Sequence, residues 1–233
     1  MLGAVIFDFD GVITDSEILH FRAFNAVLSD HGLELAKKEY YAHYLGLNDK
    51  DCFKTLIGEG RLGIKVSQIG ELIRRKTLIF EELARTDGKI IEGVRPFLDM
   101  LASNAVPMAI CSGALRAEIE LILDDSGLRD FFRAIVSAEQ VKRGKPHPEG
   151  FLLTLRKLSE RLSSPMTAKQ CIVVEDSHWG LKAAQAAGMH TVAVTNTYDA
   201  DQLASAEKIV ERLDSLTLAD LTQLCRPDAD NLV

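Results

Sequence analysis

The sequence has little of what marks secreted, membrane or zinc-binding proteins. It contains four cysteines, which are widely spaced: Cys52, Cys111, Cys171 and Cys225. They form no C-x-x-C or Cys/His pattern, which argues against a zinc site or a disulfide framework. No basic leader precedes a long apolar stretch, and no apolar run approaches the roughly 18 to 20 residues that span a bilayer. These absences predict a cytoplasmic protein that does not enter membranes.

Positive charge is also scarce. The chain carries 27 Lys and Arg against 34 Asp and Glu, which gives a formal net charge of -7 and a sequence pI of about 5.4. Nucleic-acid backbones and anionic membrane surfaces select basic faces, so neither is an expected partner. An anionic substrate would have to meet a local positive site. The 233 residues, 47% of them hydrophobic, suffice for a large α/β core with a smaller domain attached.

Short apolar runs, partly β-branched, predict buried strands. They lie at residues 3–9, 106–111, 134–136, 171–174 and 191–194. Apolar residues spaced three and four apart predict helices at 94–105, 115–123, 151–162 and 181–187. Strands that alternate with helices form parallel sheets with right-handed crossovers. The sequence therefore predicts an α/β fold whose core is a doubly wound, Rossmann-like parallel sheet.

One segment interrupts this alternation directly after the first strand. From Ser16 to about Lys89 the periodicity is helical, and Asp15 or Ser16 is available to cap its first helix. Such an insertion is typical of a cap over the sheet. We therefore expect three parts: an α/β core domain at 1–15 and 90–226, a small all-helical cap domain at 16–89, and a loose tail at 227–233.

Polar side chains follow the predicted strands at the edge where parallel strands end. In open α/β sheets, ligands bind at this edge. The residues are Asp8 and Asp10 after the first strand, Ser112 and Gly113 after the run 106–111, Glu175 and Asp176 after the run 171–174, and Lys145 in the loop before the helix at 151–162. The parallel topology thus predicts that these side chains converge.

Each of these residues has a structural explanation when taken singly. An aspartate at a strand end often forms a turn, Ser112 alone would cap a helix, and Lys145 alone would be a solvated surface charge. Together, the four carboxylates would repel one another and raise their own pKa values unless a hard cation held them, and oxygen ligands suit Mg²⁺. The combination predicts a magnesium site where a phosphoryl group is held and attacked by one carboxylate.

In this order, the motifs resemble those of the haloacid dehalogenase superfamily. The resemblance rests on four segments: Asp8-Phe9-Asp10-Gly11, Ser112-Gly113, Lys145-Pro146 and Glu175-Asp176-Ser177. The helical insertion resembles the small cap of the branch that contains β-phosphoglucomutase and phosphoglycolate phosphatase. The family's dehalogenases lack the second aspartate, so Asp10 indicates phosphate chemistry.

The resemblance implies a role for each matching residue at the predicted edge. Asp8 would be the nucleophile that forms an aspartyl phosphate, and Asp10 would be the general acid and base. Ser112, Gly113 and Lys145 would hold the phosphoryl oxygens. The implied function is a phosphatase that hydrolyses a small phosphorylated metabolite.

The resemblance also implies where Mg²⁺ binds. Its ligands would be the Asp8 side chain, the Asp10 main-chain carbonyl and Asp176, with Glu175 as a direct or water-mediated contact. Sugar phosphates, phosphoglycolate and other small monoesters all remain possible substrates. The sequence leaves a monomer and a dimer equally open.

The predicted cap bears on the choice between hydrolysis and phosphoryl transfer. His20 has two interpretations. It is either a partly buried helix residue, or it is similar to the histidine at the same point in β-phosphoglucomutase, which faces the substrate. That mutase grips its second phosphate with a cap arginine, where this sequence has Asp49, with Lys50 adjacent. The missing arginine favours a phosphatase, and a sugar phosphomutase is the alternative. The run Arg74-Arg75-Lys76 is either a solvated face or the source of one inward cation.

Two other functions stay under consideration from the sequence. Phosphonate cleavage would need a cap lysine that forms a Schiff base, for which Lys50 and Lys54 are the candidates. A non-catalytic phosphate-sensing domain would use the same carboxylates and lysine. A sensor needs no positioned acid and base, so Asp10 argues against it.

Overall fold

The computed structural model describes residues 1–45 and 47–226, and the tail predicted at 227–233 lies outside the described residues. The chain divides into two compact units. We call Met1–Thr14 and Ile90–Val233 the α/β unit, and Asp15–Lys89 the helical unit. Each unit has its own buried core.

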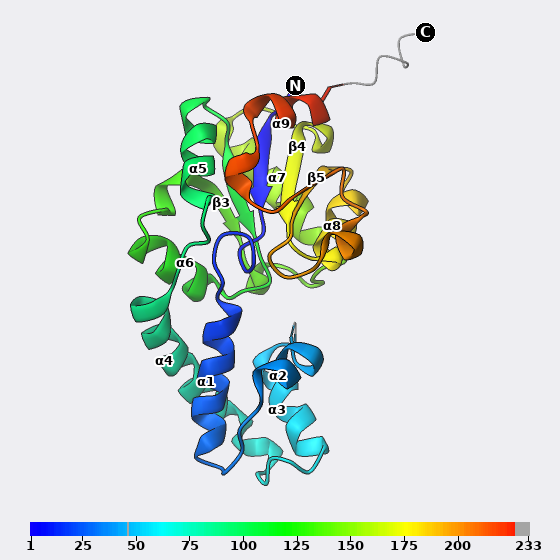
Figure 1. Ribbon diagram of the computed structural model, residues 1–233. Helices are drawn as coiled ribbons and strands as arrows, with labels where there is room; N and C mark the ends of the chain where they lie inside the picture. The colour runs from blue at the N-terminus through cyan, green and yellow to red at the C-terminus, as the bar shows by residue number, and fades with distance from the viewer. Residues whose placement is uncertain (46, 227–233) are drawn as a thin grey trace. The chain divides into compact units, whose positions relative to one another are not determined.

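The α/β unit is built on one parallel sheet, as predicted (Figure 1). Its strands are β1 (Ala4–Phe7), β2 (Met108–Cys111), β3 (Phe132–Val136), β4 (Cys171–Glu175), β5 (His190–Val194) and β6 (Lys208–Val210). Their order across the sheet is β3-β2-β1-β4-β5-β6. Every residue of β1, β2 and β4 is buried, which explains why these strands read as unbroken apolar runs. This arrangement confirms the doubly wound α/β fold.

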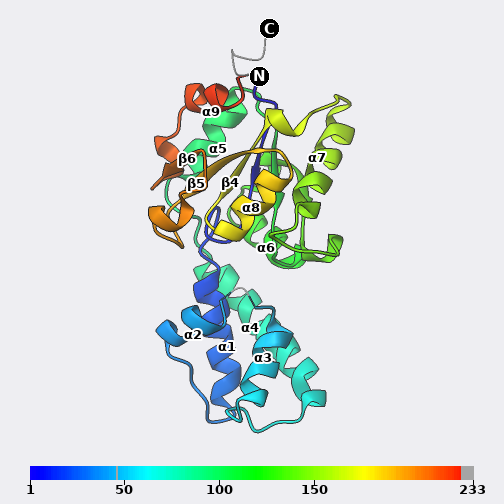
Figure 2. The ribbon, with the colours of Figure 1, turned by 90° about the vertical axis from the view of Figure 1, so that its right-hand side faces the viewer.

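Helices cover both faces of the sheet. They are α5 (Val94–Ser103), α6 (Arg116–Asp125), α7 (Glu149–Leu162), α8 (His178–Ala186) and α9 (Leu218–Leu224). Helices α7 and α8 pack on one face, where Phe151 and Ala183 join the same buried cluster as Ile6 of β1. On the other face, the Phe97 ring of α5 meets Phe7 edge to face, with 6.0 Å between ring centroids. Figure 2 shows α5 and α7 on opposite sides of the sheet.

The helical unit contains no strand among its described residues, as predicted. Its helices are α1 (Glu17–Ser29), α2 (Lys37–His43), α3 (Asp49–Gly58) and α4 (Ile69–Asp87). Their apolar faces bury a core that includes Phe24, Leu28, Tyr40 and Phe53. In the part of the chain that the structure describes, no helix is long and apolar enough to cross a membrane.

The chain leaves and re-enters the α/β unit at neighbouring points. Thr14 forms an antiparallel bridge with Ile90, and the Ile91 N–H donates to the Ile13 carbonyl at 3.0 Å. These contacts fix the segment after β1, which carries Asp8 and Asp10. The long insertion therefore begins and ends beside the strand that bears the predicted nucleophile.

Candidate active site

The polar residues that follow β1, β2 and β4 lie at one edge of the sheet because these strands are parallel neighbours. Phe7 pairs with Ile110 and with Val174, so the three strands end almost level. Asp8 follows Phe7, Ser112 follows β2, and Glu175 is the last residue of β4. All three side chains are buried.

Lys145 supplies the positive charge of this site. Its Nζ donates to Asp8 Oδ1 at 2.6 Å and also pairs with Glu175 Oε1, while the Phe151 ring lies 5.4 Å from the nitrogen. Burial alone would lower the pKa of Lys145, but the two carboxylates outweigh it and raise that pKa above its ordinary value. Lys145 is therefore a permanent cation, and it is the local positive site that the acidic sequence required.

Three carboxylates meet beside this lysine. Oxygen atoms of Asp8, Glu175 and Asp176 all lie within 4.8 Å of one another. Burial raises the pKa of Asp8 to about 7, with Lys145 opposing and the charges of Glu175 and Asp10 adding to the rise. Burial, with the charges of Glu175 and Asp8 adding to it, raises the pKa of Asp176 well above its usual range. One ammonium group does not offset this charge, so the donor set fits a hard divalent cation.

Glu175 is held by the protein on both of its oxygens. Oε1 accepts from Lys145, and Oε2 accepts from the N–H groups of Asp176 and Ser177 at 3.1 Å each and from Ser177 Oγ at 2.9 Å. A Cβ at Gly180 would lie 1.7 Å from Glu175 Oε1, so only glycine fits there. Glu175 thus orients Lys145 and the turn that carries Asp176.

Asp10, Ser112 and Gly113 lie at the open side of this cluster. Ser112 Oγ is 3.5 Å from Asp10 Oδ2 and accepts from the Ala114 N–H at 2.9 Å. Asp10 is half-buried and Gly113 is exposed. A group held by Ser112 would therefore have a carboxyl group next to it that is accessible to solvent and able to exchange protons.

The loop after β5 adds residues that the sequence analysis missed. Thr197 hydrogen-bonds Asp176, and Asn196 Nδ2 donates to the Gly11 carbonyl at 2.8 Å. Gly11 has φ +75°, and a Cβ there would lie 1.9 Å from Asp176 Oδ2. The signal was present, because polar residues follow the apolar run at 191–194 just as they follow the other strands.

The two candidate residues of the helical unit differ in their surroundings. His20 is half-buried, stacks on Phe80 with 4.1 Å between ring centroids, and has Nδ1 2.6 Å from Lys76 Nζ. Burial, reinforced by Lys76, lowers the pKa of His20 well below its usual value, so the imidazole is neutral. Lys50 is exposed at the start of α3. Within Arg74-Arg75-Lys76, Lys76 is the buried cation, and its Nζ lies 2.9 Å from Asp49 Oδ1.

The chain is similar to curated proteins that act on phosphate esters. It is 33% identical over 196 residues to the fructose-1-phosphate phosphatase YqaB of Escherichia coli, covering 82% of this chain and 95% of that one. It is 29% identical over 228 residues to the chloroplastic 5-amino-6-(5-phospho-D-ribitylamino)uracil phosphatase of Arabidopsis thaliana. That match covers 97% of this chain, which spans 58% of the length of the Arabidopsis protein.

The fold is also that of a solved structure. The crystal structure of CbbY from Rhodobacter sphaeroides in complex with phosphate matches with a TM-score of 0.83, at 23% sequence identity, over 95% of this chain and all of that one. The profile of the haloacid dehalogenase-like hydrolases matches residues 5–194, which include every site residue that the sequence predicted. The chain therefore belongs to the haloacid dehalogenase-like hydrolases and is an enzyme that hydrolyses phosphate esters.

Proposed function

We propose that this chain is a Mg²⁺-dependent phosphatase that hydrolyses a small phosphate monoester, such as a sugar phosphate, through an aspartyl phosphate on Asp8. The observation that carries the proposal is the cluster of the buried Asp8, Glu175 and Asp176 with the half-buried Lys145 at the carboxyl edge of the sheet. The similarity to a sugar phosphate phosphatase supports the substrate class.

The reaction divides between two aspartates. Lys145 and Ser112 bind the phosphoryl oxygens and orient phosphorus toward Asp8. An Asp8 oxygen attacks phosphorus as the ester bond to the leaving oxygen breaks, and Asp10 gives that oxygen its proton. In the second step Asp10 takes a proton from water, the water attacks phosphorus, and Asp8 is released with inorganic phosphate.

The metal would be held by Asp8, Asp176 and the Asp10 carbonyl, with Glu175 orienting this set. Bound Mg²⁺ supplies charge neutralisation for the carboxylates and polarisation of the phosphoryl group. This neutralisation would lower the pKa of Asp8 from about 7, which matters because only the ionised carboxylate is a nucleophile. Weaker repulsion between the carboxylates would also stabilise the folded chain.

Chelation should therefore stop phosphate release, and added Mg²⁺ should restore it. We also expect Mg²⁺ to raise the thermal midpoint of the wild-type chain but not that of Asp176→Asn, because one buried ligand is lost. The exposed Asp99 gives the matched control, since Asp99→Asn should respond to Mg²⁺ as the wild type does. If Mg²⁺ raises the thermal midpoint of Asp176→Asn as much as that of the wild type, Asp176 is not a metal ligand.

The helical unit bears on the choice between phosphatase and mutase. We propose that it is the cap, with His20 near the substrate. Asp49 holds the buried Lys76 in an ion pair, whereas Arg74 pairs with Glu71 and Arg75 with Asp30. A mutase needs an uncommitted cap cation for the second phosphate of its bisphosphate intermediate. Because these three cations are already in ion pairs, the helical unit supports hydrolysis of a monophosphate. The exposed Lys50 is the alternative cation for a second phosphate.

Asp49→Asn should destabilise the helical unit. Its Lys76 partner is 1% exposed and Asp49 is 25% exposed, so the variant leaves a buried cation without its countercharge. We expect a loss of roughly 1 to 3 kcal/mol in the free energy of unfolding, less than the roughly 3 to 5 of a fully buried pair. Urea unfolding followed by far-UV circular dichroism measures it. Asp51→Asn removes a half-exposed carboxylate of the same helix and should change stability by about 0.5 kcal/mol at most.

A panel of phosphorylated metabolites tests the proposed function itself. Release of inorganic phosphate from sugar monophosphates, phosphoglycolate and an aryl phosphate should occur with Mg²⁺ and stop without it. β-Glucose 1-phosphate with its bisphosphate primer tests the mutase. If the chain converts this substrate to glucose 6-phosphate faster than it releases phosphate, the proposed function is wrong and the chain is a mutase.

A further inference from the structure

Two adjoining cavities lie beside the outer strand β3 of the α/β unit. The larger, about 370 Å³, includes Met108, the first residue of β2, and Phe131, which precedes β3. The smaller, about 230 Å³, runs along the outer strand β3 between α6 and α7. Arg133 of β3 lines both. The lining of neither cavity includes Asp8, Asp10, Ser112, Lys145, Glu175 or Asp176, so both are separate from the candidate active site.

The smaller cavity is strongly basic in a chain whose net charge is -7. Its charged lining is Arg116, Arg129, Arg133, Lys157, Arg161 and Glu160. Burial is the largest cause that lowers the pKa of Lys157, and the like charges of Arg116, Arg156 and Arg161 add to it. An anion bound among these side chains would relieve that repulsion.

Two of the cations already have a structural role. Arg116 Nη1 donates to the Ile135 carbonyl at 3.0 Å, Arg129 Nη1 donates to the Phe132 carbonyl at 3.1 Å, and both arginines pair with Glu120. They protect the open edge of β3 and occupy backbone acceptors that an added strand would need. Among residues 1–45 and 47–226, no hydrogen-bond or ion-pair partner is found for the side chains of Arg133, Lys157 and Arg161.

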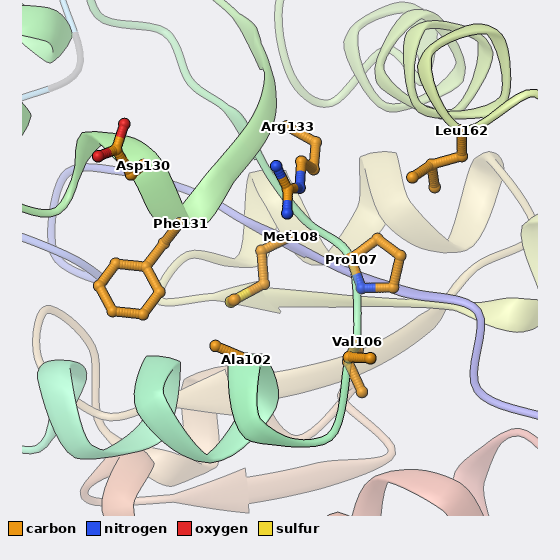
Figure 3. A pocket seen from close by; sticks show the side chains of 9 residues that line it. Ala102, Val106, Pro107, Met108, Asp130, Phe131, Arg133 and Leu162 are labelled. Atoms are coloured by element: carbon orange, nitrogen blue, oxygen red, sulfur yellow. The ribbon is translucent and has the colours of Figure 1, made fainter.

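The larger cavity is mainly apolar. Figure 3 shows the Phe131 ring towards one end and Leu162 towards the other, with Met108 and Pro107 between them. Its volume of about 370 Å³ falls in the range of about 300 to 1,000 Å³ usual for small-molecule sites. Asp130 is its carboxylate, which disfavours a second anionic group there. A ligand that fits both cavities carries its negative charge at one end and an apolar ring at the other.

We propose that this edge binds a phosphorylated small molecule with a planar or apolar ring. Its phosphate contacts Arg133, Lys157 and Arg161, and its ring lies against Phe131 and Met108. Arginine and lysine side chains match phosphate oxygens, and an aromatic face next to an arginine suits a planar ring. The site is separate from the catalytic edge, so its occupation does not depend on the proposed phosphatase reaction.

Adenosine 5′-monophosphate is a suitable probe, titrated into the whole chain by calorimetry with EDTA present to prevent turnover. We expect one saturable site. Arg133→Gln and Lys157→Gln should each raise the dissociation constant on the order of tenfold, the effect of one lost charge-assisted contact. Arg156→Gln is the matched control, because it removes a cation of the same helix that lines neither cavity. Adenosine and inorganic phosphate should each bind more weakly than the monophosphate.

The variants distinguish a specific site from diffuse charge attraction and from binding at the catalytic edge. The proposal is supported if Arg133→Gln and Lys157→Gln bind the probe more weakly but hydrolyse an aryl phosphate at the wild-type rate. Equal weakening by Arg156→Gln indicates diffuse attraction to a basic surface and overturns it. Weakening by Ser112→Ala instead of Arg133→Gln places the probe at the catalytic edge and also overturns it, as does the absence of saturable binding.

Discussion

Asp8→Asn should abolish phosphate release while the fold stays intact. The amide has the shape of the carboxylate, and its oxygen can still accept from Lys145, whose Nζ lies 2.6 Å from Asp8 Oδ1. It lacks the negative oxygen that attacks phosphorus, so no covalent intermediate forms. We expect a loss in kcat on the order of 10⁴-fold or more, as for other residues that perform the chemistry.

Initial rates of phosphate release with an aryl phosphate measure this loss, and circular dichroism with a thermal scan checks the fold. Asp99→Asn is the matched control because it makes the same chemical change at an exposed position on α5. It should keep wild-type rates. A purified Asp8→Asn protein that retains turnover, or wild-type protein that never carries phosphate on Asp8 after rapid quenching, would exclude Asp8 as the nucleophile.

Asp10→Asn should slow both chemical steps, by an amount that depends on the leaving group. General acid and base catalysis contributes on the order of 10² to 10⁴ in rate. An alkyl phosphate such as a sugar phosphate needs a proton on its leaving oxygen, so formation of the aspartyl phosphate should show the full loss. A nitrophenyl phosphate has a leaving group stable without a proton, so the same step should be much less affected.

Rapid-quench measurements distinguish these steps. With the aryl substrate, Asp10→Asn should release about one equivalent of nitrophenol in a burst and then stall, because water is no longer activated to attack the aspartyl phosphate. Equal slowing of the first step for alkyl and aryl substrates would mean that Asp10 positions the substrate and does not transfer the proton. Unchanged single-turnover rates would remove it from the mechanism altogether.

Much of the α/β unit follows from sequence because its pattern is local. Residues 4–7 and 171–174 are unbroken apolar runs, and the rule that parallel strands end at one edge brings Asp8, Ser112 and Glu175 together without any distance information. The sequence analysis missed β6 and α9. Strand β6 is three residues long and only half-buried, and α9 has seven residues, so neither gives a clear periodicity.

The contacts that specify the helical unit are of a different kind. Lys76 meets His20 and Asp49 across 56 and 27 residues of sequence, and each residue alone is an ordinary polar position on a helix. The residues of the run Arg74-Arg75-Lys76 are all cations, so the sequence does not distinguish them. Only the packing of α4 decides that the third is buried. The role of Thr197 was missed because the polar residues after the run 191–194 were not considered as ligands.

The antiparallel bridge between Thr14 and Ile90 has a consequence for how such enzymes diversify. Because the chain departs and returns at adjacent points, the number of residues between them does not enter the geometry of the sheet. A lineage can lengthen, shorten or exchange that segment as a module while Asp8 keeps its neighbours from β2 and β4. The inserted segment and the residues at the carboxyl edge of the sheet can then change independently of one another.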